Sequence, residues 1–203
     1  IHIPYCKRKC SYCNFHFSTL LKTKEEVLKA MLTEIRLQQN FFPDKTLIET
    51  IYFGGGTPSM LSTAELNSLL NELQKYFTIT EHPEITLEAN PDDLSKEYLS
   101  ALKKDTEINR FSIGVQSFFD EDLQYMHRAH NAAEAIHSIK YAQEIGFENL
   151  SVDLIYGTPT MSNENWKKNL QTVFDLKVPH ISCYALTVEE KTVLASQIKK
   201  QKI

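Results

Sequence analysis

Residues 1–13, IHIPYCKRKCSYC, place a short apolar stretch directly before three closely spaced cysteines, Cys6, Cys10 and Cys13. The apolar residues predict a strand, and the cysteines then lie on the loop that follows it. Thiolates ligate the irons of Fe–S clusters, and a [4Fe–4S] cube normally takes four of them. Three thiolates on one loop hold three corners and leave one iron open, and an open position distinguishes a reactive metal site from a structural one. The spacing therefore predicts a reactive iron–sulfur site.

Two other interpretations of the cysteines stay open at this point. His16 is close enough in sequence to complete a Cys₃His zinc site, which is a common structural arrangement. The three thiols also fit an exposed cluster that binds no metal. Clustered cysteines in a cytosolic protein are more often metal ligands or redox groups than disulfides. The intervening Lys7, Arg8 and Lys9 favour the thiolate forms by opposite charge, so we expect a metal site.

A second motif, GGGTP at residues 54–58, directly follows a predicted strand at residues 50–53. Glycine allows positive φ angles and close approach of the backbone to a ligand. Three glycines at the end of a strand expose N–H and C=O groups to a polar ligand. The motif is neither a P-loop nor the spaced dinucleotide fingerprint, and a flexible turn is the alternative interpretation.

Further out, short apolar runs alternate with longer amphipathic segments. Strands are predicted at residues 1–4, 50–53, 85–89, 110–115, 150–156 and 180–186. Helices are predicted at residues 24–41, 63–77, 95–104, 132–145 and 163–176. Ser62 and Glu65 form a capping box before the second of these helices, and Gly146 ends the fourth. Six strand–helix units of this kind predict an α/β fold with parallel strands in a partial, laterally open (β/α)₆ barrel.

The faces of the predicted strands indicate where a ligand binds. In residues 109–118, Phe111, Ile113 and Val115 alternate with polar or small residues, so the apolar face should pack on helices. The same alternation places Thr86 with Glu88 and Ser151 with Asp153, each pair on the opposite, inward face. A sealed barrel would be filled with aliphatic side chains instead. Inward polar groups therefore predict a ligand-lined interior, with a solvent-exposed strand face as the alternative.

Composition excludes several classes of protein. Hydrophobic residues make up 42% and charged residues 24% of the chain, as in ordinary globular proteins. The formal net charge is −4 and no basic stretch is interleaved with aromatics, so nucleic acid is not an expected partner. No apolar run approaches the roughly 18 residues that span a bilayer, and no signal peptide opens the chain, so we expect a cytoplasmic location.

The two motifs and several further stretches carry a family resemblance. They are IHIPYC, YFGGGTPSML, EITLEANPDDL, NRFSIGVQSF, HRAH and DLIYGTP. Together they resemble the radical S-adenosylmethionine (SAM) superfamily, and within it the oxygen-independent coproporphyrinogen III oxidase family with its heme-chaperone branch of the HemW type. The resemblance covers nearly the whole chain. The opening IHIP reads as half a strand and the charged helical pattern at residues 189–202 has no closing cap. We therefore expect residues 1–203 to be one radical SAM core domain, with N-terminal residues and a C-terminal domain missing.

The resemblance implies a set of cofactor residues. Cys6, Cys10 and Cys13 would hold a [4Fe–4S] cluster, and SAM would chelate its open iron. Tyr12 would lie beside the cofactor. The remaining SAM-pocket positions that match are Gly55, Gly56, Thr57, Glu88, Gln116, Arg128, Asp153 and Ala185.

Phe15 separates two functions that the resemblance allows. Oxidases of the family carry a fourth cysteine two residues after the third, whereas chaperones of the HemW type resemble CxxxCxYCxF, which Tyr12 and Phe15 fit. The chaperone interpretation implies heme as cargo, a heme-acceptor protein and an electron donor, and allows peripheral membrane contact. The alternative is an enzyme that decarboxylates propionates of coproporphyrinogen III, an oxidoreductase. A zinc-stabilised binding module is the third hypothesis.

The other histidines and the fourth cysteine receive structural interpretations. His127 and His130 flank Arg128, but histidines on a polar segment are seldom metal or heme ligands, so we expect neither to bind one. Cys183 lies in the apolar run HISCYALT and is expected to be a small buried hydrophobe.

Overall fold

The sheet contains six parallel strands whose order in space is their order along the chain. The computed structural model describes residues 1–43 and 45–201. Every neighbouring pair of strands is parallel, and β1 and β6 form the two edges. The strands are β1 (His2–Ile3), β2 (Leu47–Gly55), β3 (Thr78–Ala89), β4 (Arg110–Gln116), β5 (Asn149–Tyr156) and β6 (His180–Ala185).

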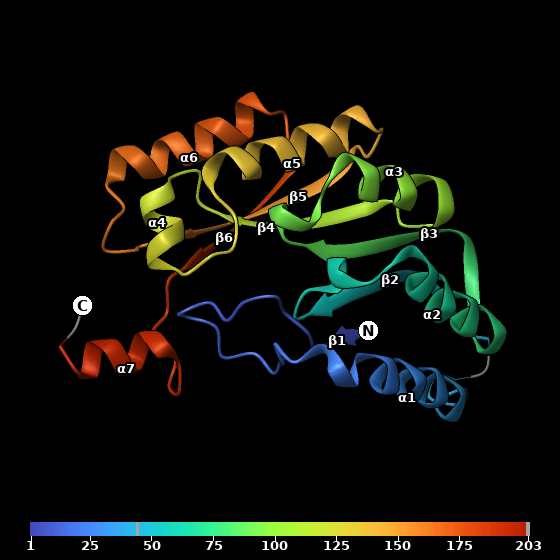
Figure 1. Ribbon diagram of the computed structural model, residues 1–203. Helices are drawn as coiled ribbons and strands as arrows, with labels where there is room; N and C mark the ends of the chain where they lie inside the picture. The colour runs from blue at the N-terminus through green and yellow to red at the C-terminus, as the bar shows by residue number, and fades with distance from the viewer. Residues whose placement is uncertain (44, 202–203) are drawn as a thin grey trace.

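The helices that connect these strands cover one side of the sheet, and a last helix follows β6 and lies apart from that layer (Figure 1). They are α1 (Lys24–Leu37), α2 (Thr63–Tyr76), α3 (Lys96–Asp105), α4 (Asp120–Tyr125), α5 (Ala132–Glu144), α6 (Asn163–Asp175) and α7 (Val193–Lys199), with 3₁₀ turns at Leu21–Thr23, Pro58–Met60 and Pro91–Asp93. Within the described residues, none of the helices is both long and apolar enough to cross a membrane. The predicted partial, laterally open (β/α)₆ barrel is confirmed, because the sheet runs from β1 to β6 without closing.

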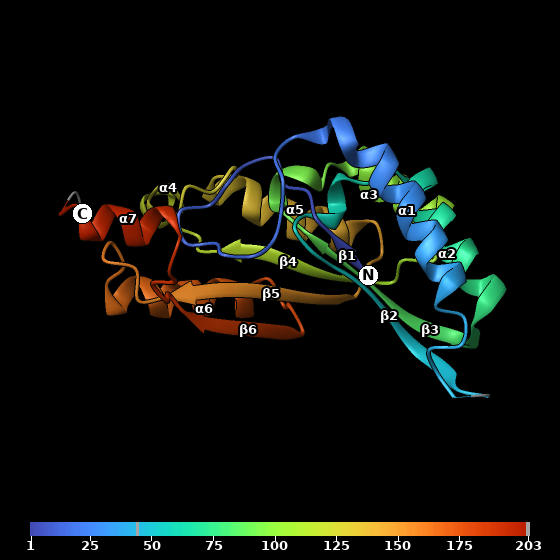
Figure 2. The ribbon, with the colours of Figure 1, turned by 90° about the horizontal axis from the view of Figure 1, so that it is seen from below.

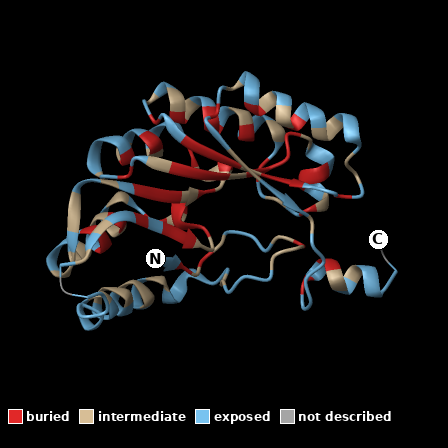
Figure 3. Cartoon of the chain, turned by 180° about the vertical axis from the view of Figure 1, so that it is seen from behind, coloured by how far each residue is buried: buried red, intermediate tan, exposed pale blue. Residues whose placement is uncertain are grey.

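The core lies between the outer face of the sheet and the helices. Phe111, Ile113 and Val115 are fully buried there, as the alternation in β4 predicts. Leucines of α2 and α3 pack against the same face, and the buried residues are concentrated in the middle of the sheet (Figure 3). Burying such apolar side chains contributes about 1.5–3 kcal/mol each, so this layer dominates the stability of the fold.

Local signals set the helix ends. The Ser62 side chain accepts a hydrogen bond from the backbone N–H of Glu65, and the Glu65 side chain accepts one from that of Ser62, which confirms the predicted capping box. Gly146 has a φ of 93° just after α5, which confirms its role in ending that helix. The predicted helix at residues 24–41 ends earlier, at Leu37, and Pro43 lies in the turn that leads to β2.

Two strands are longer than their sequence predicts. β2 begins at Leu47 and β3 at Thr78, and their pairing shifts register between Ile48 and Thr50. Pro83 lies within β3, and a proline normally argues against a strand. The irregular pairing accommodates it, because Ile48 pairs with Ile79 whereas Thr50 pairs with Glu84. The short helix α4 was not predicted, because its six residues are too few for a periodic apolar pattern.

Candidate functional site

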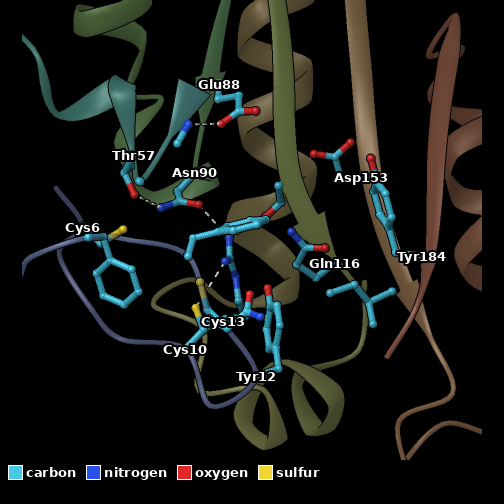
Figure 4. Close-up of a pocket in the computed structure, with 18 of the residues that line it drawn as sticks. Cys6, Cys10, Tyr12, Cys13, Thr57, Glu88, Asn90, Gln116, Asp153 and Tyr184 are labelled. Atoms are coloured by element: carbon cyan, nitrogen blue, oxygen red, sulfur yellow. Dashed lines mark hydrogen bonds between the residues drawn. The ribbon is translucent and has the colours of Figure 1, made fainter. Parts of the chain in front are cut away.

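A cavity of about 520 Å³ opens at the carboxyl ends of the strands. Seen edge-on, the loop that follows β1 lies across that end of the sheet (Figure 2). All twelve residues predicted to bind the cluster or SAM line this one cavity, and Figure 4 labels Cys6, Cys10, Cys13, Glu88 and Asp153 among them. They are Cys6, Cys10, Tyr12, Cys13, Gly55, Gly56, Thr57, Glu88, Gln116, Arg128, Asp153 and Ala185. The alternation of strand residues thus brings chemistry-bearing side chains together from across the whole sheet.

The cysteine loop, residues 6–13, is held on one side by the chain that follows α4. The backbone N–H of Ser11 donates to the carbonyl of Met126 at 3.1 Å, and its hydroxyl donates to that of Tyr125 at 3.1 Å. The His127 ring bonds the carbonyl of Lys9 through Nδ1 at 2.8 Å. These contacts fix the middle of the loop, where Cys10 lies.

A second set of contacts fixes the ends of the cysteine loop. The backbone N–H of Cys6 donates to the carbonyl of Ser18 at 3.0 Å. The Leu194 N–H, in α7, donates to the carbonyl of Ser11 at 2.8 Å, and Asn14 donates through Nδ2 to Glu189 at 3.2 Å. The loop is therefore held by residues that follow it in sequence and by the C-terminal segment around α7.

The charges around the thiols differ from the sequence prediction. Lys7 forms ion pairs with Asp92 at 3.1 Å and with Asp93, and Arg8 donates to the carbonyl of Arg128 at 3.1 Å. The prediction that these two cations serve the thiolates is wrong, because their charged ends are used elsewhere. The cations that act on the thiols are Arg128, whose Nη1 lies 3.4 Å from the Sγ of Cys10, and Lys9, whose charge lowers the pKa of Cys13 as predicted.

Burial is the main influence on two of the thiols. It raises the pKa of Cys6, and the nearby Cys13 and Cys10 raise it further, while a hydrogen bond with Thr57 lowers it. Burial also raises the pKa of Cys13, against the lowering effect of the Phe15 backbone N–H and of the Arg128 charge. A bound cation is what compensates such thiolates most directly, since thiolates rather than thiols are metal ligands.

The structure does not place His16 with the three cysteines as a Cys₃His zinc site requires. His16 is exposed, does not line the cavity with the three cysteines, and uses its carbonyl to bond His2 at 3.1 Å. In residues 1–43 and 45–201, no group of three His, Cys, Asp or Glu side chains is arranged around one ion. An iron–sulfur cluster binds each thiolate through a different iron, so it does not need the sulfurs to converge on one point.

The GGGTP turn presents its backbone to the cavity. Gly55 has a φ of +108°, and its N–H donates to the Glu88 carboxylate at 3.0 Å. A Cβ on Gly56 would lie 2.6 Å from the carbonyl oxygen of Tyr5 and 2.7 Å from that of Ile3. The third glycine position is therefore closed to any side chain, because the turn packs directly against the chain that leads into the cysteine loop.

Two carboxylates face the interior, as the alternation predicts. Glu88 accepts a hydrogen bond from the Tyr52 hydroxyl at 2.8 Å. Asp153 accepts one from Ser112 at 3.4 Å, and its pKa is raised by burial and by the charge of Glu88. The predicted solvent-exposed alternative does not apply, since Ser112 and Asp153 line the cavity.

Gln116 and Arg128 carry polar atoms that have no partner. Gln116 sits at a register shift between β4 and β5 with a φ of 69°, and its Oε1 is buried without a hydrogen bond. The Nε of Arg128 is likewise buried and unpartnered. Leaving such groups unsatisfied costs about 1–3 kcal/mol each, which a polar ligand in the cavity would recover. Together with the three thiols, these atoms fit a cluster and a ligand that carries both an acceptor and a donor.

Tyr12 and Ala185 also line the cavity. Tyr12 packs with Leu123, Met126 and Ile155, which anchors the cysteine loop on α4 and β5. Ala185 ends β6 and is exposed, so it offers backbone rather than a side chain to the cavity.

Asn90 is a cavity residue that the sequence did not single out. Its amide accepts a hydrogen bond from Arg128 at 2.7 Å and donates one to Thr57 at 3.2 Å. It follows β3 directly and precedes Pro91, and this Asn-Pro pair, two residues after the inward-facing Glu88, is the signal that was present.

The structure also bears on the predictions for His127, His130 and Cys183. His130 is buried, bonds the carbonyl of Val115 at 2.9 Å, and has its pKa lowered to about 4 by burial and by the Arg128 charge. Its Nδ1 is buried without a partner, and neither His130 nor His127 lines the cavity. The prediction for Cys183 is wrong: it is exposed, because it lies on β6, an edge strand that has a neighbouring strand on one side only.

A family comparison agrees with this geometry. The family model of the radical SAM superfamily matches residues 1–173. The chain belongs to the radical SAM superfamily. Membership implies a [4Fe–4S] cluster and SAM as cofactors, while the residues that hold each of them remain a prediction.

Individual relatives narrow the position within the superfamily. The heme chaperone HemW of Lactococcus lactis subsp. lactis is 36% identical over 199 residues, which is 98% of this chain and 51% of that protein. HemW of Bacillus subtilis is 36% identical over 207 residues, 100% of this chain and 54% of that protein. The solved structure of the coproporphyrinogen III oxidase HemN from Escherichia coli, a radical SAM enzyme, matches with a TM-score of 0.85 at 28% identity, covering 98% of this chain and 45% of that one. The chain thus spans about half the length of its relatives.

Proposed function

We propose that the chain is the radical SAM core of a heme chaperone of the HemW type. In this proposal Cys6, Cys10 and Cys13 hold a [4Fe–4S] cluster, and SAM occupies the adjoining cavity. Two kinds of support converge. The three thiols and the predicted SAM residues share one cavity, and several relatives over nearly the whole chain are heme chaperones by name.

The chain's own residues have distinct roles in the proposal. Arg128 offers a cation and Glu88 and Asp153 offer carboxylates to the polar ends of SAM, while Gly55 and Gly56 allow its close approach. When bound, a cluster with one open iron supplies a coordination site and an electron to its ligand. Orientation of that ligand and exclusion of water are the protein's contribution.

Phe15 is the observation that carries the choice of a chaperone over an oxidase. It lies two residues after Cys13, lines the mouth of the cavity and is 69% exposed. The oxidase pattern has a fourth cysteine at this position, and a phenyl ring can neither ligate a metal nor carry a proton. An apolar ring at the cavity mouth instead suits a flat apolar cargo such as heme.

The partners follow from this role. Heme is the proposed cargo, a heme-dependent protein the acceptor, and a reduced electron-transfer protein the donor to the cluster. A cytoplasmic location belongs to the proposal, because free thiols that bind iron are stable in reducing compartments.

The alternative is a coproporphyrinogen oxidase, favoured by the structural match to HemN at a TM-score of 0.85. Shared fold and shared cofactors do not decide between them, because one fold hosts many functions.

The deciding experiment uses the full-length protein, reconstituted anaerobically with iron and sulfide. Vinyl-group formation from coproporphyrinogen III and stable heme binding are measured in the same preparation. We expect heme binding without turnover. Turnover in a preparation that does not retain heme would overturn the chaperone proposal and support the oxidase.

A further inference from the structure

Arg128 is held in the cavity wall by three acceptors. Its Nη1 donates to the Cys10 sulfur at 3.4 Å, and its Nη2 donates to the carbonyl of Gly114 at 2.7 Å and to the Oδ1 of Asn90 at 2.7 Å. Gly114 leaves room for this, since a Cβ there would lie 3.3 Å from Nη2. The position of the guanidinium over Cys10 therefore depends on two groups at the ends of β4 and β3.

Asn90 bonds Arg128 through its side chain, whereas Gly114 does so through its backbone carbonyl. The Asn90 side chain and backbone are themselves held by hydrogen bonds. Its Nδ2 donates to the hydroxyl of Thr57 at 3.2 Å, and its backbone N–H donates to the hydroxyl of Ser59 at 3.3 Å. Ser59 in turn donates to Asp93 at 2.6 Å, and Asp93 pairs with Lys7 of the cysteine loop. One amide thus joins the GGGTP turn, the cysteine loop and Arg128 (Figure 4).

We propose that Asn90 is a positioning residue that sets Arg128 over Cys10 and aligns the GGGTP turn with it. This role rests on the cluster and SAM assignment and is independent of whether heme or a porphyrinogen is the further ligand.

The chemistry of the side chain explains why an amide serves here. An asparagine amide offers one acceptor and two donors without a net charge, so it can hold Arg128 and Thr57 together. An aspartate of the same shape would also hold Arg128, but as an ion pair that cancels its charge next to the cavity. A SAM carboxylate would then meet a neutralised guanidinium. An alanine would leave both Arg128 and Thr57 without this partner.

The test uses full-length protein, reconstituted anaerobically, as wild type, Asn90→Asp and Asn90→Ala. The dissociation constant of SAM is measured by calorimetry, and the reduced cluster is examined by electron paramagnetic resonance with and without SAM. We expect SAM affinity to fall about tenfold or more in both variants, because hydrogen bonds to charged groups are strong. We also expect an altered resonance before SAM is added, since the Arg128 contact with Cys10 changes.

Asn109→Ala is the matched control. Asn109 also uses both ends of its amide, accepting from the N–H of Ile85 at 2.9 Å and donating to the carbonyl of Pro83 at 2.8 Å. It directly precedes β4, beside the middle of β3, and does not line the cavity. We expect this variant to melt earlier but to bind SAM with an affinity within about twofold of the wild type.

Three results would overturn the inference. The first is that Asn90→Asp, which keeps the shape of the side chain and folds most readily, binds SAM and shows the same resonance as the wild type. Asn109→Ala could weaken SAM binding as much as Asn90→Ala, which would mark a general loss of stability. A wild-type protein with neither cluster nor SAM binding would remove the cofactor assignment itself, a failure distinct from the other two.

Discussion

At the scale of single residues, the charged form of Asp153 lowers the stability of the fold, although it is the form proposed to contact SAM. Its pKa is raised by burial and by the nearby Glu88, so the folded protein holds its proton more tightly than the unfolded chain does. The stabilisation linked to that proton is therefore present below the ordinary pKa of 3.8 and is lost as the pH rises through the higher folded value. At neutral pH the charged Asp153 destabilises the fold.

The variant Asp153→Asn tests this directly. We expect it to be more stable than the wild type at pH 7, with the difference shrinking as the pH falls toward 3.8. If Asp153 contacts SAM as proposed, the same variant should bind SAM about tenfold more weakly. Urea unfolding across pH and calorimetry with SAM measure the two effects. A variant less stable at neutral pH, with unchanged SAM affinity, would contradict both expectations.

Which residues line the site could be predicted where a strand period decides the direction of a side chain. Glu88, Gln116 and Asp153 follow that period and do line the cavity. The role of Asn90 could not be predicted, because it arises from contacts with Thr57, 33 residues away, and Arg128, 38 residues away. The redirection of Lys7 to Asp93 has the same origin: a partner brought near only by folding.

At the scale of elements, the junction of β1 with the GGGTP turn decides where the cysteine loop lies. Gly56 N–H donates to the carbonyl of Ile3 at 2.8 Å, and β1 pairs with the end of β2 through only two residue pairs. So short a strand depends on this close backbone contact for its position.

Replacing Gly56 with alanine should therefore displace β1. The added Cβ meets backbone atoms of Tyr5 and Ile3, which cannot rotate away, and such overpacking costs about 1–3 kcal/mol. We expect the Gly56→Ala protein to bind less iron after reconstitution. Gly157→Ala is the control: Gly157 has a φ of +83° with open space around it, so strain of about 1 kcal/mol is the whole cost. Equal iron content in the two variants would contradict this account.

Element boundaries were predictable where a single residue sets them. Ser62 with Glu65 starts α2, and Gly146 ends α5, because each satisfies backbone groups at the helix end locally. The early starts of β2 and β3 could not be predicted, because the irregular pairing around Pro83 depends on the sequences of both strands.

At the scale of the whole molecule, the repeated strand–helix pattern predicts parallel strands, since each parallel strand needs a crossover, and the predicted partial barrel agrees with the observed sequential strand order. What the pattern does not show is which strand faces remain uncovered. Cys183 is exposed because β6 pairs with β5 on one side only, so an apolar run that reads as buried forms a sheet edge.

The central claim concerns the cysteine loop, which folding places opposite Arg128 at the open end of the sheet. The direct measurement is iron and sulfide analysis with electron paramagnetic resonance on full-length protein reconstituted anaerobically, alongside its Cys10→Ala variant. The account predicts about four irons and four sulfides per chain, a resonance that shifts when SAM is added, and loss of both in the variant. Bound zinc in place of iron, or a cluster in the wild type that does not respond to SAM, would contradict it.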